Sequence, residues 1–221
     1  MQKSVWLFTE GKAKDNALLG NKGANLHEMT ALDLPVPFGL IFTTRTCIEY
    51  NRLGEKLPDG IITQVMQVIT KIEIHQGKKF GVPQNQLLVS VCSGAAVSMP
   101  GMMDTILNLG LNEETVYALA NKTANMRFAK DSYRRFIQMY SNVVMGVEAY
   151  KFEELIENYK LTKGVLLDTD LDENDWDGLI KDFKEVVKNK TKKEFPQNVF
   201  DQLFGHFFES KCVEILFLQR L

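Results

Sequence analysis

The stretch LLVSVCSGAAVSMPGMMDTILNL, residues 87–109, decides how the first half of this chain is expected to fold. Its opening residues, 87–91, form an apolar run of strand length. Residues 104–109 are suited to be the return strand on the far side of the intervening loop. A pair of strands joined by a loop is therefore predicted here.

The loop between these strands combines small side chains with Gly101, so main-chain N–H groups are left uncovered and a ligand can approach closely. Open amides of this kind suit phosphate oxygens. The loop is not a P-loop, because no Gly-Lys-Ser/Thr follows. The alternative from composition alone is a plain hairpin loop in which Met99, Met102 and Met103 fill gaps in the core.

Working outward toward the N-terminus, short apolar runs alternate with stretches of helical spacing. Strands are expected at residues 4–9 and 39–43, and helices at residues 24–32 and 59–76. A further helix is expected after residue 43, with Thr44 as its cap. Strands separated by helices predict a mixed α/β layer structure.

After Gly110 the pattern becomes almost entirely helical. Asn112 is expected to cap the first helix, and further helices are predicted at residues 115–120, 127–144, 152–159, 172–187 and 196–208. The fold class predicted is therefore α+β, with an α/β lobe at residues 1–111 and a helical subdomain at residues 112–197. Residues 198–221 are expected to return to the lobe and to close with a strand-like run.

A second candidate for anion binding is LGNKGAN, residues 19–25, a turn that leads into a helix with Lys22 at its mouth. A lysine beside a helix N-terminus adds a point charge where anions already prefer to lie. The alternative is an ordinary solvated surface lysine.

Other polar residues are expected to be structural. His27, His75 and His206 are isolated, without partners at metal-ligand spacing, so each is interpreted as a surface or packing residue. The acidic residues at 168–175 lack the glycine and terminal glutamate of a calcium loop, which favours a solvated turn with a helix cap. Arg134 and Arg135 are expected to form surface ion pairs. No catalytic residue and no metal ligand is predicted.

Composition excludes several classes of protein. The 221 residues carry a net charge of −2, without the clustered basic excess of a nucleic-acid-binding surface. The start of the chain turns polar too soon for a signal peptide, and no apolar run approaches the roughly 20 residues of a membrane helix. Three scattered cysteines, Cys47, Cys92 and Cys212, fit a reducing compartment. A globular, cytoplasmic protein is expected.

Five stretches together resemble a known family. They are LGNKGANL at residues 19–26, LPVPFG at 34–39, SVCSGAAVSMPGMMDT at 90–105, RFAKDSYRRFIQMY at 127–140 and EFPQ at 194–197. This set resembles the N-terminus of the pyruvate, phosphate dikinases. The related phosphoenolpyruvate synthases share the lysine turn and the proline step but carry a different phosphate loop, so the Met-Pro-Gly-Met-Met run favours the dikinases.

The resemblance implies the front part of an ATP-grasp nucleotide-binding domain, in an enzyme that interconverts ATP, phosphate and pyruvate with AMP, diphosphate and phosphoenolpyruvate. It implies ATP and Mg²⁺ as ligands of the complete enzyme. It assigns nucleotide contacts to Lys22, Cys92, Gly101 and Met103. The family has an arginine where this chain has Cys92, and a cysteine replaces neither the charge nor the fork of donors.

Three hypotheses follow for the function of the chain. The first is a nucleotide-binding part of a dikinase that is inactive alone, since by the resemblance the sequence ends before the second ATP-grasp lobe, the phosphohistidine domain and the barrel domain. The second is a subunit of a split dikinase, completed in trans by the remaining part of the enzyme. The third is a non-catalytic interaction module. Nucleic acid and membrane are not expected as partners.

Overall fold

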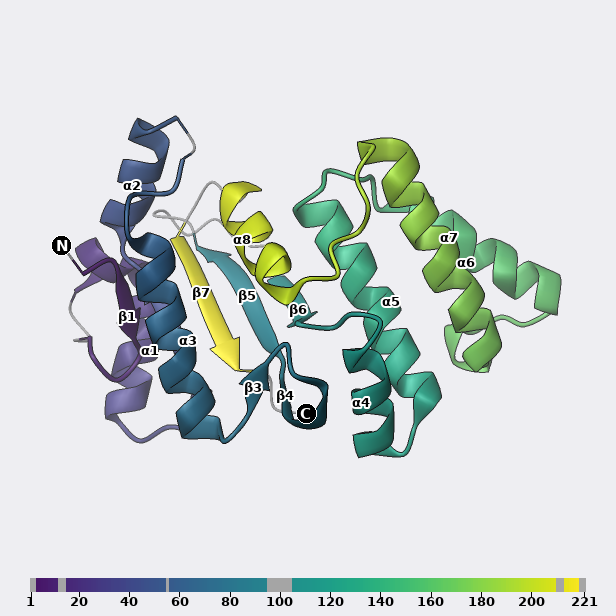
Figure 1. Ribbon diagram of the computed structural model, residues 1–221, viewed down its shortest axis with the longest axis horizontal. Helices are drawn as coiled ribbons and strands as arrows, with labels where there is room; N and C mark the ends of the chain where they lie inside the picture. The colour runs from purple at the N-terminus through teal and green to yellow at the C-terminus, as the bar shows by residue number, and fades with distance from the viewer. Residues whose placement is uncertain (1–2, 12–14, 55, 95–104, 210–212, 219–221) are drawn as a thin grey trace. The chain divides into compact units, whose positions relative to one another are not determined.

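The computed structural model describes residues 3–11, 15–54, 56–94, 105–209 and 213–218 (Figure 1). The chain divides into two compact units. The first consists of Met1–Phe80, Leu87–Leu107 and Ser210–Leu221, and the second of Gly81–Gln86 and Asn108–Glu209. Helices and small sheets alternate along the chain, which confirms the predicted α+β class.

The first unit is built on a five-stranded sheet with the strand order β1-β2-β7-β5-β6. Its strands are β1 (Val5–Leu7), β2 (Gly39–Phe42), β5 (Val89–Gly94), β6 (Thr105–Leu109) and β7 (Val213–Leu218). β7 comes from the end of the sequence, yet it lies between β2 and β5 and pairs antiparallel with both. Figure 1 shows β7 beside β5.

The pairing register divides the side chains of this sheet between two faces. Trp6 is the Cα partner of Ile41, and Ile41 and Cys92 share Ile215 as their partner on β7. Directly opposite residues lie on the same face of a sheet. Trp6, Ile41 and Cys92 therefore share one face, and the residues one step along each strand belong to the other.

Two helices cover opposite faces of the sheet. α1 (Asn16–Ala31) lies over the face of Ile41, where a Cβ on Gly23 would be only 1.8 Å from Ile41 Cδ1. α3 (Ile61–Gln76) lies over the other face, where Val5 and Val68 line the same shallow hollow. The buried residues of α3 recur at helical spacing, as the sequence pattern predicts.

Three local boundaries differ from the prediction. α1 begins eight residues earlier than residue 24, but it is interrupted at Gly20, which has φ 67° and ψ 168°. The cap of α2 (Thr44–Arg52) is Thr43, not Thr44, because Thr43 has the extended backbone of a capping residue and its side chain accepts from the N–H of Thr46. The strand predicted at residues 87–91 is divided between β4 (Gln86–Leu87) and β5.

The second unit is helical. Its helices are α4 (Thr115–Thr123), α5 (Met126–Val143), α6 (Tyr150–Lys163), α7 (Glu173–Thr191) and α8 (Val199–Glu209), with short 3₁₀ turns at Pro83–Asn85 and Asp168–Asp170. One further short strand, β3 (Lys79–Phe80), completes the elements described. The helix predicted at residues 196–208 begins instead at Val199, after Pro196.

Aromatic side chains form the core of the second unit. Tyr133, Phe136 and Tyr140 of α5 meet the ring of Phe195, with centroid distances between 5.6 and 6.4 Å. The predicted caps also have clear partners. Asn112 accepts from the N–H groups of Glu114 and Thr115 ahead of α4, and Asp172 forms the capping box of α7.

Candidate functional site

Lys22 lies in the first helical turn after the break in α1. The backbone of Gly20 is left-handed, a conformation that glycine adopts without the cost that a side chain adds. Regular helix therefore starts again at Asn21, so Lys22 lies near a helix N-terminus. Such a turn favours anions, and the half-buried Lys22 adds a positive charge to it.

The helix that carries Lys22 is fixed closely against the sheet. Leu19 and Ile41 form a buried cluster with Phe8, just after β1. Gly23 leaves no room between α1 and Ile41 for even a methyl group. The position of Lys22 above this face of the sheet is therefore determined by packing on both sides of it.

Cys92 lies in β5 on the face that α1 covers. Its side chain is buried, with Sγ 3.2 Å from Thr105 Oγ1 of β6. Leu107, two residues beyond Thr105, shares this face and is 40% exposed. Because β7 separates β5 from β2, the Cα atoms of Cys92 and Ile41 are about 10 Å apart, two strand spacings.

The structure thus places two of the four predicted nucleotide contacts on one face of one sheet. Lys22 is next to Gly23, which covers Ile41, and Cys92 lies in the same row as Ile41. Gly101 and Met103, the other two, lie outside the described residues.

The described part of the chain contains no group of three or more His, Cys, Asp or Glu side chains that could hold a metal ion. Among the same residues, no helix is long and apolar enough to cross a membrane. Within the described ranges, Cys47 and Cys92 form no disulfide bond.

His27 is a packing residue, as predicted, but it is more completely buried than an isolated histidine suggests. It is 1% exposed, and its two ring nitrogens lie 2.7 Å from the carbonyl oxygen of Gly23 and 2.8 Å from that of Leu7. No sequence pattern indicates this, because both partners are main-chain atoms that any residue supplies.

Arg134 forms an ion pair, as predicted, but it is buried and not on the surface. It is 4% exposed, with its guanidinium 2.5 Å from Asp131 and 4.8 Å above the ring of Trp176. Burial lowers the pKa of Arg134, and the carboxylate of Asp131 acts in the opposite direction. The side chain lies in the aromatic interior of the second unit, which its position on an amphipathic helix did not reveal. Arg135 does form an exposed ion pair with Asp131.

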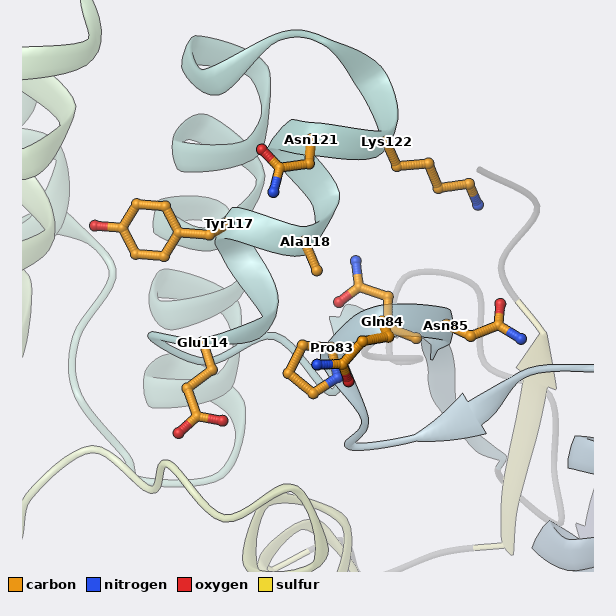
Figure 2. A pocket seen from close by; sticks show the side chains of 9 residues that line it. Pro83, Gln84, Asn85, Glu114, Tyr117, Ala118, Asn121 and Lys122 are labelled. Carbon is orange, nitrogen blue, oxygen red and sulfur yellow. The ribbon is translucent and has the colours of Figure 1, made fainter.

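The second unit contains a separate cavity of about 500 Å³. Figure 2 shows its lining, in which side chains of α4 face those of Pro83, Gln84 and Asn85. Gln86 also lines it, and both polar atoms of its buried amide lack a hydrogen-bond partner. Neither Lys22 nor Cys92, the two predicted nucleotide contacts that the structure describes, lines this cavity, so the candidate nucleotide site is the one on the sheet of the first unit.

Comparison with known proteins identifies relatives along nearly the whole chain. No family model matches it. The chain is 52% identical to a pyruvate, phosphate dikinase of Clostridium symbiosum over 206 residues, which cover 93% of this chain and 24% of the relative. It is 47% identical to one of Entamoeba histolytica over 199 residues, covering 90% and 22% respectively. A third, of Rhizobium meliloti, is also 47% identical and covers 90% and 23%.

These relatives all carry the name pyruvate, phosphate dikinase, so the chain comes from a dikinase lineage. More particularly, the chain is homologous to the N-terminal region of pyruvate, phosphate dikinase. It spans less than a quarter of the length of the relatives it matches.

Proposed function

We propose that this chain is the nucleotide-binding front part of a pyruvate, phosphate dikinase and that its first unit belongs to an ATP-grasp-type domain. The observation that carries the proposal is the placement of Lys22 and Cys92 on one face of the same sheet. In this proposal the polyphosphate of ATP lies along that face, with Gly101 and Met103 contributing from the loop after β5. The division into a lobe, a helical subdomain and a return segment belongs to the same proposal.

Positive charge for the phosphates comes chiefly from Lys22. Phosphoryl transfer depends on positioning and charge more than on covalent chemistry from the protein. Cys92 is buried, with Sγ 3.2 Å from the hydroxyl oxygen of Thr105, and a cysteine does not offer the fork of donors of an arginine. We therefore expect the isolated chain to bind Mg-ATP more weakly than micromolar.

The described residues suit phosphate better than they suit Mg²⁺. The described residues offer a helical turn that follows a break, and a lysine, for phosphate oxygens, but they contain no cluster of three potential metal ligands. In this proposal the chain contacts the nucleotide, and Mg²⁺ is held elsewhere in the complete enzyme. The remaining part of the dikinase, on the same chain or supplied in trans in the cytoplasm, is then the partner that completes the reaction.

Titration of the 221-residue chain with Mg-ATP tests the proposal, followed by NMR so that millimolar affinities are measured. Cys92→Arg restores a charged donor, and one charge-assisted hydrogen bond contributes about 1.5–3 kcal/mol, or about 10- to 100-fold in affinity. Cys92→Ser is the matched control and leaves the affinity unchanged.

Lys22→Gln is expected to weaken binding by about tenfold or more for the same reason. Lys71→Gln removes the same charge from α3, on the opposite face of the sheet, and is expected to have little effect. Equal effects of the two lysine changes, or no ATP binding by either the parent or Cys92→Arg, would refute the nucleotide site. Dikinase turnover by the chain alone would contradict the expected dependence on the rest of the enzyme.

A further inference from the structure

The imidazole of His27 connects the lysine turn to the sheet beneath it. One ring nitrogen, Nδ1, lies 2.7 Å from the carbonyl oxygen of Gly23, the residue directly after Lys22. The other, Nε2, lies 2.8 Å from the carbonyl oxygen of Leu7, the last residue of β1. A neutral ring donates to one of these oxygens, and a ring that carries both protons donates to both.

This connection lies just after the break in α1. The helix restarts after Gly20, so Lys22 lies in the first turn that follows the break. His27 lies one turn further along the continuous part of the helix, and its Nδ1 contacts the carbonyl oxygen of Gly23, the residue after Lys22. The imidazole therefore restricts the orientation of the Gly23 carbonyl group, and with it the orientation of the turn that contains Lys22.

The ring itself has little freedom to move. It is 1% exposed and meets Phe8 edge-on, with ring centroids 6.0 Å apart. The main chain at Gly11 runs directly over its edge: a Cβ there would lie 2.1 Å from Cδ2 and 2.3 Å from Nε2. Three segments, namely the end of β1, the chain at Gly11 and α1, thus meet on this one side chain.

We propose that His27 is a positioning residue for nucleotide binding, because it holds the Lys22 turn in a fixed orientation against β1. The proposal rests on the proposed function of Lys22 as a phosphate contact. His27 itself does not touch the nucleotide. It acts through the carbonyl oxygen of Gly23 and hence through the direction in which the turn presents Lys22.

The first measurement is backbone amide hydrogen exchange in the 221-residue chain, which needs no nucleotide. In His27→Leu, which fills the site but donates no hydrogen bond, the amides of residues 21–26 are expected to exchange about tenfold faster, while those of α3 are unchanged. His75→Leu is the matched control, since His75 only stacks on Phe38, with centroids 4.1 Å apart. Unchanged exchange at residues 21–26 would overturn the proposal.

The second measurement is Mg-ATP affinity in a double-mutant cycle with Lys22. His27→Leu is expected to weaken binding about tenfold in the parent and to have no further effect in the Lys22→Gln background, because it acts through that lysine. Additive losses would overturn the positioning role. If Lys22→Gln alone leaves affinity unchanged, the proposed function fails instead, and the exchange measurement still decides the role of His27.

A second variant covers the case in which His27→Leu does not fold. Gly11→Ala keeps the histidine but crowds its ring. The same local increase in exchange at residues 21–26 is expected, together with the same loss of Mg-ATP affinity. Normal exchange and normal affinity in Gly11→Ala would show that the position of the ring does not control the lysine turn.

Discussion

Replacing Gly23 with alanine tests the packing that places the lysine turn on the sheet. The new Cβ would lie 1.8 Å from Ile41 Cδ1 and 3.2 Å from Ile41 Cγ1. Ordinary carbon contacts are about 3.5–4.0 Å, so Cδ1 has to move by roughly 1.7 Å. Ile41 is 0% exposed and lies on β2, between β1 and β7. It therefore has little space into which to move.

Two effects of opposite sign determine how much Gly23→Ala changes the free energy of unfolding. Alanine in a helix is favoured over glycine by about 1 kcal/mol. Overpacking a dense core costs about 1–3 kcal/mol, and the buried position of Ile41 favours the upper part of that range. We therefore expect Gly23→Ala to lower the free energy of unfolding of the first unit by about 1–2 kcal/mol.

A second substitution separates these effects. Ile41→Val removes Cδ1 and by itself costs about 0.5–1.5 kcal/mol. In that background the alanine no longer meets the closest atom, so Gly23→Ala is expected to be nearly neutral. The coupling between the two positions is then about 1–2 kcal/mol, as expected for residues in direct contact.

Urea unfolding of the four proteins measures this coupling. The chain has two tryptophans, Trp6 in the first unit and Trp176 in the second, so their indole NMR signals report the two units separately. Trp6 packs against the buried cluster that contains Ile41. If Gly23→Ala stabilises the Trp6 transition equally in both backgrounds, Gly23 does not face Ile41. The placement of Lys22 above this face would then be refuted.

Two further predictions concern the second unit. Asp172→Asn keeps a helix cap but loses the charge; in the parent, hydrogen bonds, first from Lys163 and then from the N–H of Asp175, lower the pKa of Asp172 to about 2. A carboxyl group whose pKa is lower in the folded state stabilises the fold at pH values above its unfolded pKa, which is about 3.9 for aspartate. The Tm advantage of the parent over Asp172→Asn should therefore disappear as the pH falls from about 4 to about 2. A constant Tm difference would contradict this. Gln86→Met removes a buried amide without a partner and should raise the urea-derived free energy of unfolding by about 1 kcal/mol; a loss would indicate that an ordered water satisfies the amide.

The elements that could be predicted from sequence are those with a strong local pattern. α5 and α7 have long stretches of apolar residues at helical spacing, and both occur close to the predicted residues. Starts and ends were less predictable, because they depend on the conformation of single residues. Thr43 and Thr44 are chemically identical as caps, and only the extended backbone of Thr43 decides between them. Gly20 interrupts α1 with a left-handed conformation that its sequence neighbours do not require.

The candidate site depends on a pairing that no local pattern contains. Lys22 and Cys92 are recognisable separately, but alternation within β2 or β5 does not say which strand lies between them. That strand is β7, from the far end of the sequence, and its pairing with both neighbours puts Ile41 and Cys92 in one row. A one-residue change of register on either side would place Cys92 on the opposite face from α1. The proposed nucleotide site therefore requires the C-terminal strand to be paired in this register, so substitutions that weaken this pairing should reduce Mg-ATP affinity even when Lys22 and Cys92 are unchanged.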